Sequence, residues 1–227
     1  METPNAKRPT SNSKAEVIER LTRIGVIPVV RAASAAEALA AVDAIEAGGL
    51  PVLEITMTVP GALGVIEAVT KRYGDTVLVG AGTVLDPETA RDCVAAGARF
   101  IVSPALNVRT IEWCRGADVP VMPGALTPTE VLTAWQAGAD FVKVFPCDSA
   151  GGASHVKALK APFPDIPLIP TGGVTLATVA DYIRAGAAAV GVGSNLVDTK
   201  AIAAGAASRV TDLARQYVEA VRLARAG

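Results

Sequence analysis

The sequence is poor in the residues from which metal sites and disulfide frameworks are built. Its 227 residues include one histidine, His155, and three cysteines, Cys93, Cys114 and Cys147, which show neither metal-ligand spacing nor an even number for pairing. A histidine-rich metal site and a disulfide scaffold are therefore excluded. We expect no metal, and we expect the cysteines to be buried thiols of a protein in a reducing cytoplasm.

Long hydrophobic runs and blocks of one charge sign are also missing. Charged and turn residues interrupt every apolar stretch, so no run of about 20 apolar residues offers a membrane span. The net charge is −1 and the basic residues form no stripe, which argues against nucleic acid or an anionic membrane as a partner. We expect a soluble protein that acts on small molecules.

The polar residues 1–13 lack the apolar run of a secretory signal, and we predict that they form a disordered tail. The rest of the chain, residues 14–227, shows no linker or shift in composition. A chain of this length can bury one sizeable core. We therefore expect a single domain over residues 14–227.

A repeated phrase divides this domain into alternating helices and strands. Four apolar runs follow an Ala-Gly pair, a pattern typical of a helix end, a glycine cap and a buried strand. These runs are VLEIT, FIVS, FVKVF and AVGVG, and four more are VIPVVR, TVLVGA, VPVMPG and PLIPTG. The eight runs start roughly every 20 to 27 residues, with Ala/Glu/Leu-rich helical stretches between them.

Continuous Val/Ile/Leu runs indicate strands buried on both faces, as in a parallel sheet covered by helices. Eight such units predict an α/β fold, a single-domain (β/α)8 TIM barrel. A doubly wound open sheet is the alternative. Ser13 and Glu16 have the spacing of a capping box, which predicts an extra N-terminal helix over residues 14–24 that covers the bottom of the barrel.

Three charged residues lie within or at the end of apolar strands, although only 19% of the chain is charged: Lys143 in FVKVF, Glu54 in VLEIT and Arg31 after VIPVV. Burial lowers a lysine pKa and leaves its amine free to attack a carbonyl group. Lys143 is therefore the best catalytic candidate. The alternative is a structural ion-pair cluster, or an Arg31 that only extends from a strand end into water.

Glu54 and Lys143 form the most informative pair. A glutamate near a lysine-bound intermediate can transfer protons at successive steps of a reaction. An ionised glutamate also raises the lysine pKa and so opposes the effect of burial. The resting protonation of the pair therefore stays open at this stage.

Glycine-rich turns follow several of the predicted strands at the end where barrel enzymes carry their active sites. Thr171-Gly172-Gly173 and Gly193-Ser194 each precede a helical stretch, and backbone N–H groups at two helix starts suit a phosphate. Gly80-Ala-Gly-Thr83 offers N–H groups and a hydroxyl to a second anion. The guanidinium group of Arg31 can donate two parallel hydrogen bonds to a carboxylate. Simple tight turns are the alternative for each glycine loop.

Together these motifs resemble the bacterial 2-keto-3-deoxy-6-phosphogluconate (KDPG) aldolases of the Entner–Doudoroff pathway. They also resemble relatives that cleave 4-hydroxy-2-oxoglutarate or the galactonate epimer. The resemblance covers roughly residues 14–225. It rests on GVIPVVR, LEITMTVPGA, VGAGTV, FIVSPAL, PGALTPTE, FVKVFP, PTGGV and VGVGSNL, in that order.

The resemblance implies a class I aldolase that needs neither metal nor cofactor, is usually a homotrimer, and cleaves KDPG to pyruvate and glyceraldehyde 3-phosphate. By their places in the motifs, Lys143 is the implied Schiff-base lysine and Glu54 the implied general acid and base. The other implied roles are carboxylate binding by Arg31 and Thr83, phosphate binding by Gly172, Gly173 and Ser194, and lining of the pocket by Thr58, Pro104, Phe145 and Thr171.

The chain departs from some family members at Thr58, where they carry an arginine that binds the carboxylate. Arg31 is expected to supply that charge here. Three alternatives to the KDPG reaction stay open. They are an aldolase for 4-hydroxy-2-oxoglutarate or the galactonate epimer, a phosphosugar isomerase or epimerase on the same barrel, and a non-catalytic sugar-phosphate sensor.

Overall fold

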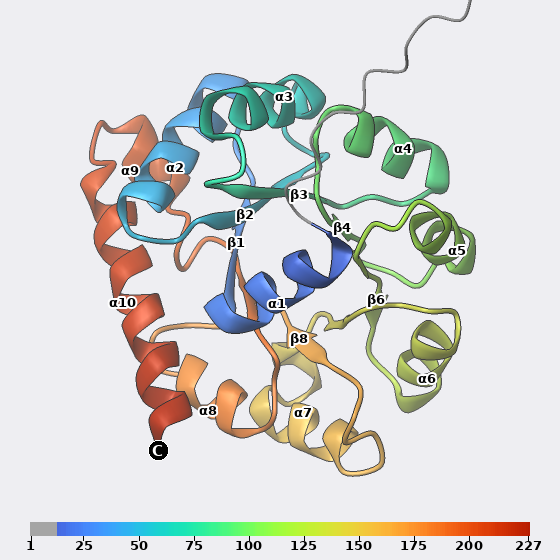
Figure 1. Ribbon diagram of the computed structural model, residues 1–227. Coiled ribbons are helices and arrows are strands. Elements are labelled where there is room, and N and C mark those ends of the chain that lie inside the picture. The colour runs from blue at the N-terminus through green and yellow to red at the C-terminus, as the bar shows by residue number, and fades with distance from the viewer. Residues whose placement is uncertain (1–12) are drawn as a thin grey trace, which may run out of the picture.

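The computed structural model describes residues 13–227, in which parallel strands lie inside a layer of helices (Figure 1). The predicted disordered tail lies outside the described residues except for Ser13. The strands are β1 (Val26–Val30), β2 (Val52–Thr56), β3 (Leu78–Gly82), β4 (Ile101–Val102), β5 (Val121–Met122), β6 (Gly124–Ala125), β7 (Val142–Val144), β8 (Leu168–Pro170) and β9 (Val190–Val192). The helices are α1 (Lys14–Ile24), α2 (Ala35–Ala47), α3 (Ala62–Tyr73), α4 (Pro87–Ala95), α5 (Val108–Gly116), α6 (Pro128–Gln136), the 3-10 helix η1 (Asp148–Ala150), α7 (Ala153–Lys160), α8 (Val179–Arg184), α9 (Thr199–Ala203) and α10 (Ser208–Ala226).

Strands that follow one another in the chain are neighbours in space. One sheet has the order β5-β4-β3-β2-β1-β9, a second has the order β6-β7-β8, and all paired strands are parallel. The last strand lies beside the first, with Val190 opposite Val26. The parallel α/β architecture is thus confirmed. A doubly wound sheet, in which the strand order reverses, is excluded.

The two sheets form one curled unit that is joined at both of its seams. At one seam, β5 and β6 are separated only by Pro123, which has no N–H group for a ladder hydrogen bond. At the other seam, an isolated bridge pairs Thr171 with Gly191, and the Ala188 N–H donates to the Leu168 carbonyl over 2.9 Å. Among residues 13–227, the strands therefore form a curled parallel sheet that is divided into two parts.

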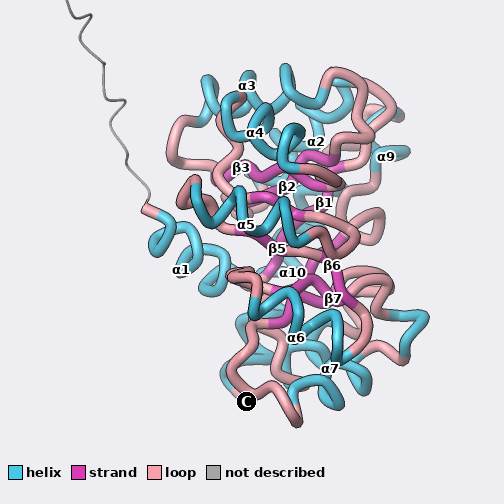
Figure 2. The backbone as a smooth tube through the Cα atoms, turned by 90° about the vertical axis from the view of Figure 1, so that its right-hand side faces the viewer, coloured by secondary structure: helices cyan, strands magenta, loops and turns pink. Residues whose placement is uncertain are grey.

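Helix α1 lies across one end of the strands (Figures 1 and 2). Its predicted bounds and its capping box of Ser13 and Glu16 are confirmed. Val17 and Leu21 of α1 are buried in an interior cluster that takes residues from both sheets. The strand-side members of this cluster are Ile27, Val52, Leu78, Phe100, Val102, Met122, Phe141, Ile169 and Ala189. The helix thus closes the end of the sheet where the strands begin.

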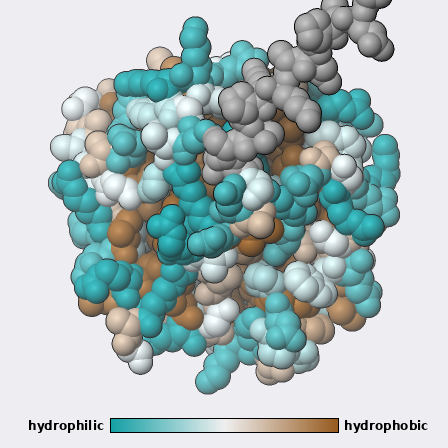
Figure 3. Space-filling view, viewed as in Figure 1, coloured by the Kyte–Doolittle hydropathy of each residue, from teal (hydrophilic) through white to brown (hydrophobic). Residues whose placement is uncertain are grey.

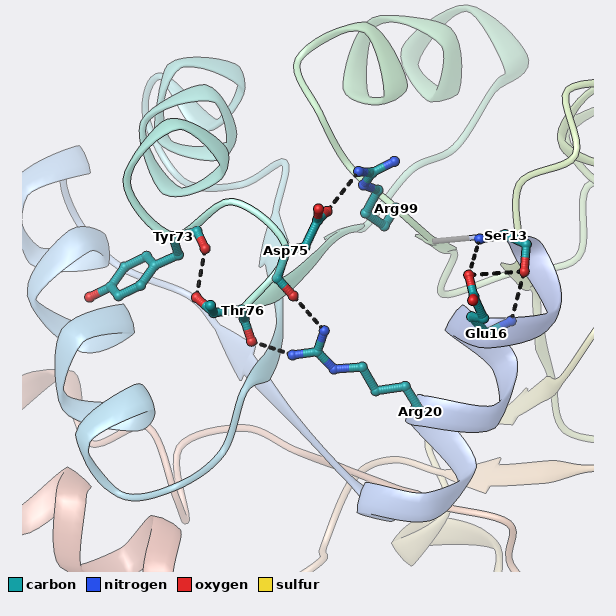
Figure 4. A network of polar contacts seen from close by, with 7 residues as sticks. All are labelled: Ser13, Glu16, Arg20, Tyr73, Asp75, Thr76 and Arg99. Carbon is teal, nitrogen blue, oxygen red and sulfur yellow. Dashed lines mark hydrogen bonds and ion pairs between the residues drawn. The ribbon is translucent and has the colours of Figure 1, made fainter. Parts of the chain in front are cut away.

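Arginine side chains hold α1 in this position. Arg20 donates to the carbonyls of Asp75 (2.7 Å) and Thr76 before β3 (Figure 4). It also donates to the Pro51 carbonyl before β2, over 2.9 Å. Arg225 of α10 donates to the last-turn carbonyls of α1, over 2.7 and 2.8 Å. The bonds from Arg225 satisfy carbonyls that the end of α1 leaves free.

Helices α2 to α10 surround the sheet, and a second apolar cluster fills the space between helices and strands (Figure 1). On the face that carries α1, hydrophilic residues spread over much of the surface, with hydrophobic ones visible between them (Figure 3). Within residues 13–227, no helix combines the length and the apolar character needed to cross a membrane.

Candidate active site

Lys143 and Glu54 enter the interior from opposite parts of the curled sheet. Side chains of a strand alternate between its two faces. Lys143 lies two residues after Phe141, and Glu54 two residues after Val52, and both of those apolar residues belong to the interior cluster. Each charged residue is only 3% exposed. Both charged side chains therefore lie in the interior of the curled sheet.

Glycines lie in the strands next to Glu54 and Lys143, and one of them leaves room for the Glu54 carboxylate. Gly80 lies opposite Glu54, and Gly124 lies opposite Lys143, in the strand register. The carboxylate of Glu54 lies directly over Gly82, where an added Cβ would come within 2.5 Å of Glu54 Oε1. Glycine at position 82 is thus required by the place of the carboxylate.

Burial favours the neutral form of both groups. It raises the pKa of the Glu54 carboxyl, against the opposite influence of Lys143 and Arg31. It also lowers the pKa of the Lys143 amine; Glu54 opposes that change, and Arg31 adds to it. No ion pair within 4.0 Å joins Lys143 to Glu54. Glu54 Oε1 is buried without a hydrogen-bond partner, so it is free to interact with a bound molecule.

A cavity of about 130 Å³ opens beyond the strand ends. It brings together six of the residues to which the resemblance gives a role, from the loops after β1, β7, β8 and β9. These six are Arg31, Phe145, Thr171, Gly172, Gly173 and Ser194, and the other lining residues are Val29, Val174, Gly191, Gly193 and Asn195.

Unpaired backbone N–H groups line this cavity. Gly172 and Gly173 both have positive φ, +96° and +72°, a conformation that suits glycine. In the part of the chain that the structure describes, the N–H groups of Gly172, Gly173, Val174, Ser194 and Asn195 donate to no protein acceptor. Successive free N–H groups in a turn form a concavity that attracts anions.

The helix starts differ from the prediction. Helix α8 begins at Val179 and α9 at Thr199, several residues after the two glycine loops. Between Gly193 and Val197 the chain makes one helical turn, in which the Val197 N–H donates to the Gly193 carbonyl over 2.8 Å. The free N–H groups therefore come from a glycine turn and an isolated helical turn.

Arg31 and Thr83 lie apart within the site. Arg31 is exposed and lines the cavity of the glycine loops. Thr83 is half-buried after β3, has a positive φ of 60°, and is absent from that cavity's lining. A positive φ is uncommon for threonine. The Gly82 carbonyl just before it accepts a hydrogen bond from the Met57 N–H over 2.8 Å.

Of the remaining predicted pocket residues, Phe145 and Thr58 follow the strands that carry Lys143 and Glu54, and Pro104 follows β4. Lys143 Nζ lies 5.1 Å from the centre of the Phe145 ring, a cation–π distance for the protonated amine. The backbone of Pro104 lies where a Cβ on Gly124 would be, at 2.2 Å from the carbonyl oxygen. Thr58 is exposed, and its hydroxyl lies 2.7 Å from that of buried Thr56.

Two residues near the cavity were missed from the sequence. Asn195 lines it and also joins the two glycine loops, because its Nδ2 donates to the Val174 carbonyl over 3.0 Å. The place of Asn195 beside Ser194 in VGVGSNL was the available signal. Asp148 packs so closely on Gly173 that an added Cβ there would lie 2.3 Å from Asp148 Cβ. No sequence pattern connects these two positions.

The three cysteines are buried, as predicted, and free. Burial raises the pKa of the Cys93 and Cys147 thiols to about 11 and that of Cys114 to about 12. They therefore stay as thiols at neutral pH. Among residues 13–227, no cluster of three or more His, Cys, Asp or Glu side chains is arranged to hold a metal ion.

Comparisons with known proteins show which family the chain is similar to. The family model for KDPG and KHG aldolase matches residues 17–213. A 2-dehydro-3-deoxy-phosphogluconate aldolase of Treponema pallidum (strain Nichols) is 38% identical over 205 residues, covering 90% of this chain and 97% of the relative. A 2-dehydro-3-deoxy-6-phosphogalactonate aldolase of Escherichia coli (strain K12) is 38% identical over 202 residues, covering 88% of this chain and 98% of the relative.

A solved structure is similar over nearly the same length. It is the KDPG aldolase from Legionella pneumophila with pyruvate captured at low pH as a covalent carbinolamine intermediate. It has a TM-score of 0.82 and 33% identity, and the match covers 90% of this chain and 97% of that one. By its sequence and its fold, this chain belongs to the KDPG and KHG aldolase family.

Proposed function

We propose that this protein is a class I aldolase that cleaves KDPG to pyruvate and glyceraldehyde 3-phosphate through a Schiff base on Lys143. The observation that carries the proposal is the buried pair of Lys143 and Glu54, in which burial lowers the pKa of the amine and raises that of the carboxyl. A neutral amine is a nucleophile, and a neutral carboxyl is a proton donor. The carbinolamine of pyruvate captured in the Legionella relative supports the same chemistry.

The first half of the cycle begins with this neutral pair. The Lys143 amine attacks the C2 ketone, and a proton moves from nitrogen to oxygen to give a carbinolamine. Glu54 donates its proton to the leaving hydroxyl, water departs, and a cationic iminium remains beside the new carboxylate. The two charges stabilise each other in an interior where an isolated charge is costly.

In the second half, the Glu54 carboxylate removes the proton of the C4 hydroxyl. The C3–C4 bond breaks, its electron pair moves into the iminium to form an enamine, and glyceraldehyde 3-phosphate leaves. Glu54 then protonates the enamine carbon. Water, deprotonated by Glu54, adds to the resulting iminium, and the release of pyruvate restores the neutral amine and carboxyl. The unpartnered Oε1 of Glu54 is suited to these transfers.

The phosphate of the substrate is assigned to the cavity of the glycine loops. Free N–H groups from Gly172, Gly173 and Ser194 meet there, and Arg31 adds a positive charge at its wall. Thr171 is 5% exposed and lines the cavity on the side of β8. We assign it to the substrate hydroxyls. Anion binding by backbone N–H groups and an arginine is a common arrangement.

We assign the carboxylate of the substrate to Thr83 and Arg31, and the walls of its pocket to Thr58, Pro104 and Phe145. The Coulombic influence of Arg31 on both Glu54 and Lys143 supports its nearness to the reacting carbon. Its place in the glycine-loop cavity also brings it near the phosphate. The carboxylate role of Arg31 and Thr83 stays a prediction.

The galactonate epimer is a second candidate substrate, because the relative that carries its name is as similar, at 38%, as the gluconate relative. Steady-state kcat/KM for both phosphorylated epimers and for 4-hydroxy-2-oxoglutarate, followed by pyruvate release, tests the choice. We expect KDPG to be cleaved with the highest kcat/KM. Equal efficiency with unphosphorylated 4-hydroxy-2-oxoglutarate would contradict the phosphate site.

We further infer that the eight strand positions close into a (β/α)8 barrel, because both sheets share one interior cluster and meet at two seams. On the family resemblance, we propose a cytoplasmic homotrimer of the Entner–Doudoroff pathway without metal or cofactor. Light scattering on the purified protein tests the trimer. Activity that persists after treatment with a metal chelator tests the absence of a metal.

A further inference from the structure

The turn after β2 carries a short chain of hydroxyl groups. Thr56 is 0% exposed, and its Oγ1 donates to the Val30 carbonyl over 3.1 Å. The Thr58 hydroxyl lies 2.7 Å from the same Oγ1. A threonine hydroxyl has one proton, and that of Thr56 is directed to Val30, so Thr58 is the donor in the second bond. The order of donation runs from Thr58 to Thr56 to Val30.

Backbone hydrogen bonds hold this turn in place. The Val59 N–H donates to the Thr56 carbonyl over 3.0 Å, which folds Thr58 back over Thr56. The Met57 N–H donates to the Gly82 carbonyl over 2.8 Å. The ends of β1, β2 and β3 are thereby fixed to one another at a single point.

The Val30 carbonyl belongs to the peptide that leads directly into Arg31. Beyond that peptide, Arg31 is exposed, and no hydrogen bond or ion pair within residues 13–227 restrains its guanidinium. The direction in which the side chain leaves the strand is therefore set by its backbone. The Thr56 hydroxyl is the side-chain group that holds this peptide.

We propose that Thr56, supported by Thr58, is a positioning residue that directs Arg31 toward an anionic group of the substrate. The proposal rests on the proposed aldolase function and adds a residue to it. Thr56 acts on binding through Arg31 and takes no part in the chemistry at Lys143.

Replacement of Thr56 by valine tests this role, because valine keeps the shape and lacks the hydroxyl. We expect Thr56→Val to raise the KM for KDPG about tenfold while kcat changes less than twofold, since the lost interaction serves ground-state and transition-state binding alike. Thr56→Ser keeps a hydroxyl and should restore a KM near that of the wild type. An equal loss in Thr56→Val and Thr56→Ser would show a packing role and overturn the proposal.

A double-mutant cycle with Arg31→Ala isolates the coupling. If Thr56 acts through Arg31, Thr56→Val should change KM less than twofold in the Arg31→Ala background. An undiminished tenfold effect there would refute the proposal. If Thr56→Val strongly lowers the melting temperature, Thr58→Val, at an exposed position, replaces it in the same cycle. We expect Thr58→Val to raise the KM for KDPG about threefold. An effect of Thr58→Val on KM that persists in the Arg31→Ala background would also refute the proposal.

Two further readouts separate the possible failures. Repeating the cycle with unphosphorylated 2-keto-3-deoxygluconate identifies the anion: an effect confined to KDPG assigns Arg31 to the phosphate, and an effect on both substrates assigns it to the carboxylate. At saturating pyruvate, trapping on Lys143 by borohydride should reach the wild-type yield in Thr56→Val. If the wild type forms no adduct, the aldolase proposal itself fails; if it does and KM is unchanged in Thr56→Val, only the positioning role fails.

Discussion

Gly82 is the position at which one added methyl group should disable the site by displacing the Glu54 carboxylate, with Glu54 and Lys143 themselves unaltered. A Cβ at residue 82 would lie 2.5 Å from Glu54 Oε1 and 2.9 Å from its Cδ, whereas ordinary contact begins at 3.4 Å. The carboxylate must therefore recede by about 0.9 Å in Gly82→Ala. A misplacement of about 1 Å costs about 100-fold in rate, so we expect kcat to fall by that factor.

The assay couples pyruvate release to NADH oxidation by lactate dehydrogenase, with folding checked by circular dichroism. Gly64→Ala is the matched control, because an added Cβ at this exposed position of α3 meets nothing within 4 Å. Its kcat should equal that of the wild type. Since Lys143 is intact, Gly82→Ala should still form the pyruvate adduct. A folded Gly82→Ala enzyme with kcat within threefold of the wild type would refute the assigned place of Glu54.

Three further predictions follow from the structure. Burial lowers the pKa of Lys143 from 10.5, so the initial rate of pyruvate trapping by cyanoborohydride should rise with pH and level off below pH 10.5. A rise with its midpoint at pH 10.5 would contradict a buried amine. Gly173→Ala places a Cβ 2.3 Å from Asp148 at a φ of +72°, and should raise the KM for KDPG at least tenfold while leaving the rate of pyruvate trapping unchanged, as single-turnover measurements would show. Arg20→Met removes the hydrogen bonds between α1 and the starts of β2 and β3. It should lower the free energy of unfolding, measured in urea, by about 1–3 kcal/mol and leave kcat unaltered. A loss of kcat would instead mean that α1 shapes the site.

Much of the fold was predictable because its signals are local. A glycine cap followed by a continuous apolar run specifies a helix end and a buried strand without reference to the rest of the chain. The capping box of Ser13 and Glu16 gave the bounds of α1 for the same reason. A lysine and a glutamate within such strands are costly unless the site uses them, which marked Lys143 and Glu54.

The parts that were not predictable depend on distant contacts. The division of the sheet at Pro123 depends on pairing with distant strands, because β5 before it pairs with β4 and β6 after it pairs with β7. The grouping of Arg31 with the glycine loops depends on the curl that brings β9 beside β1. The late starts of α8 and α9 follow from tight turns whose backbone angles the residue types alone do not determine.

The most direct test of the central claim is covalent trapping. The protein is incubated with pyruvate and borohydride, and intact-mass and peptide-mapping mass spectrometry locate the product, with Lys143→Ala as the control. We predict one reduced pyruvyl adduct per chain, on Lys143, and none in the control. A folded protein that forms no adduct, or forms one equally well in Lys143→Ala, would contradict the Schiff-base mechanism.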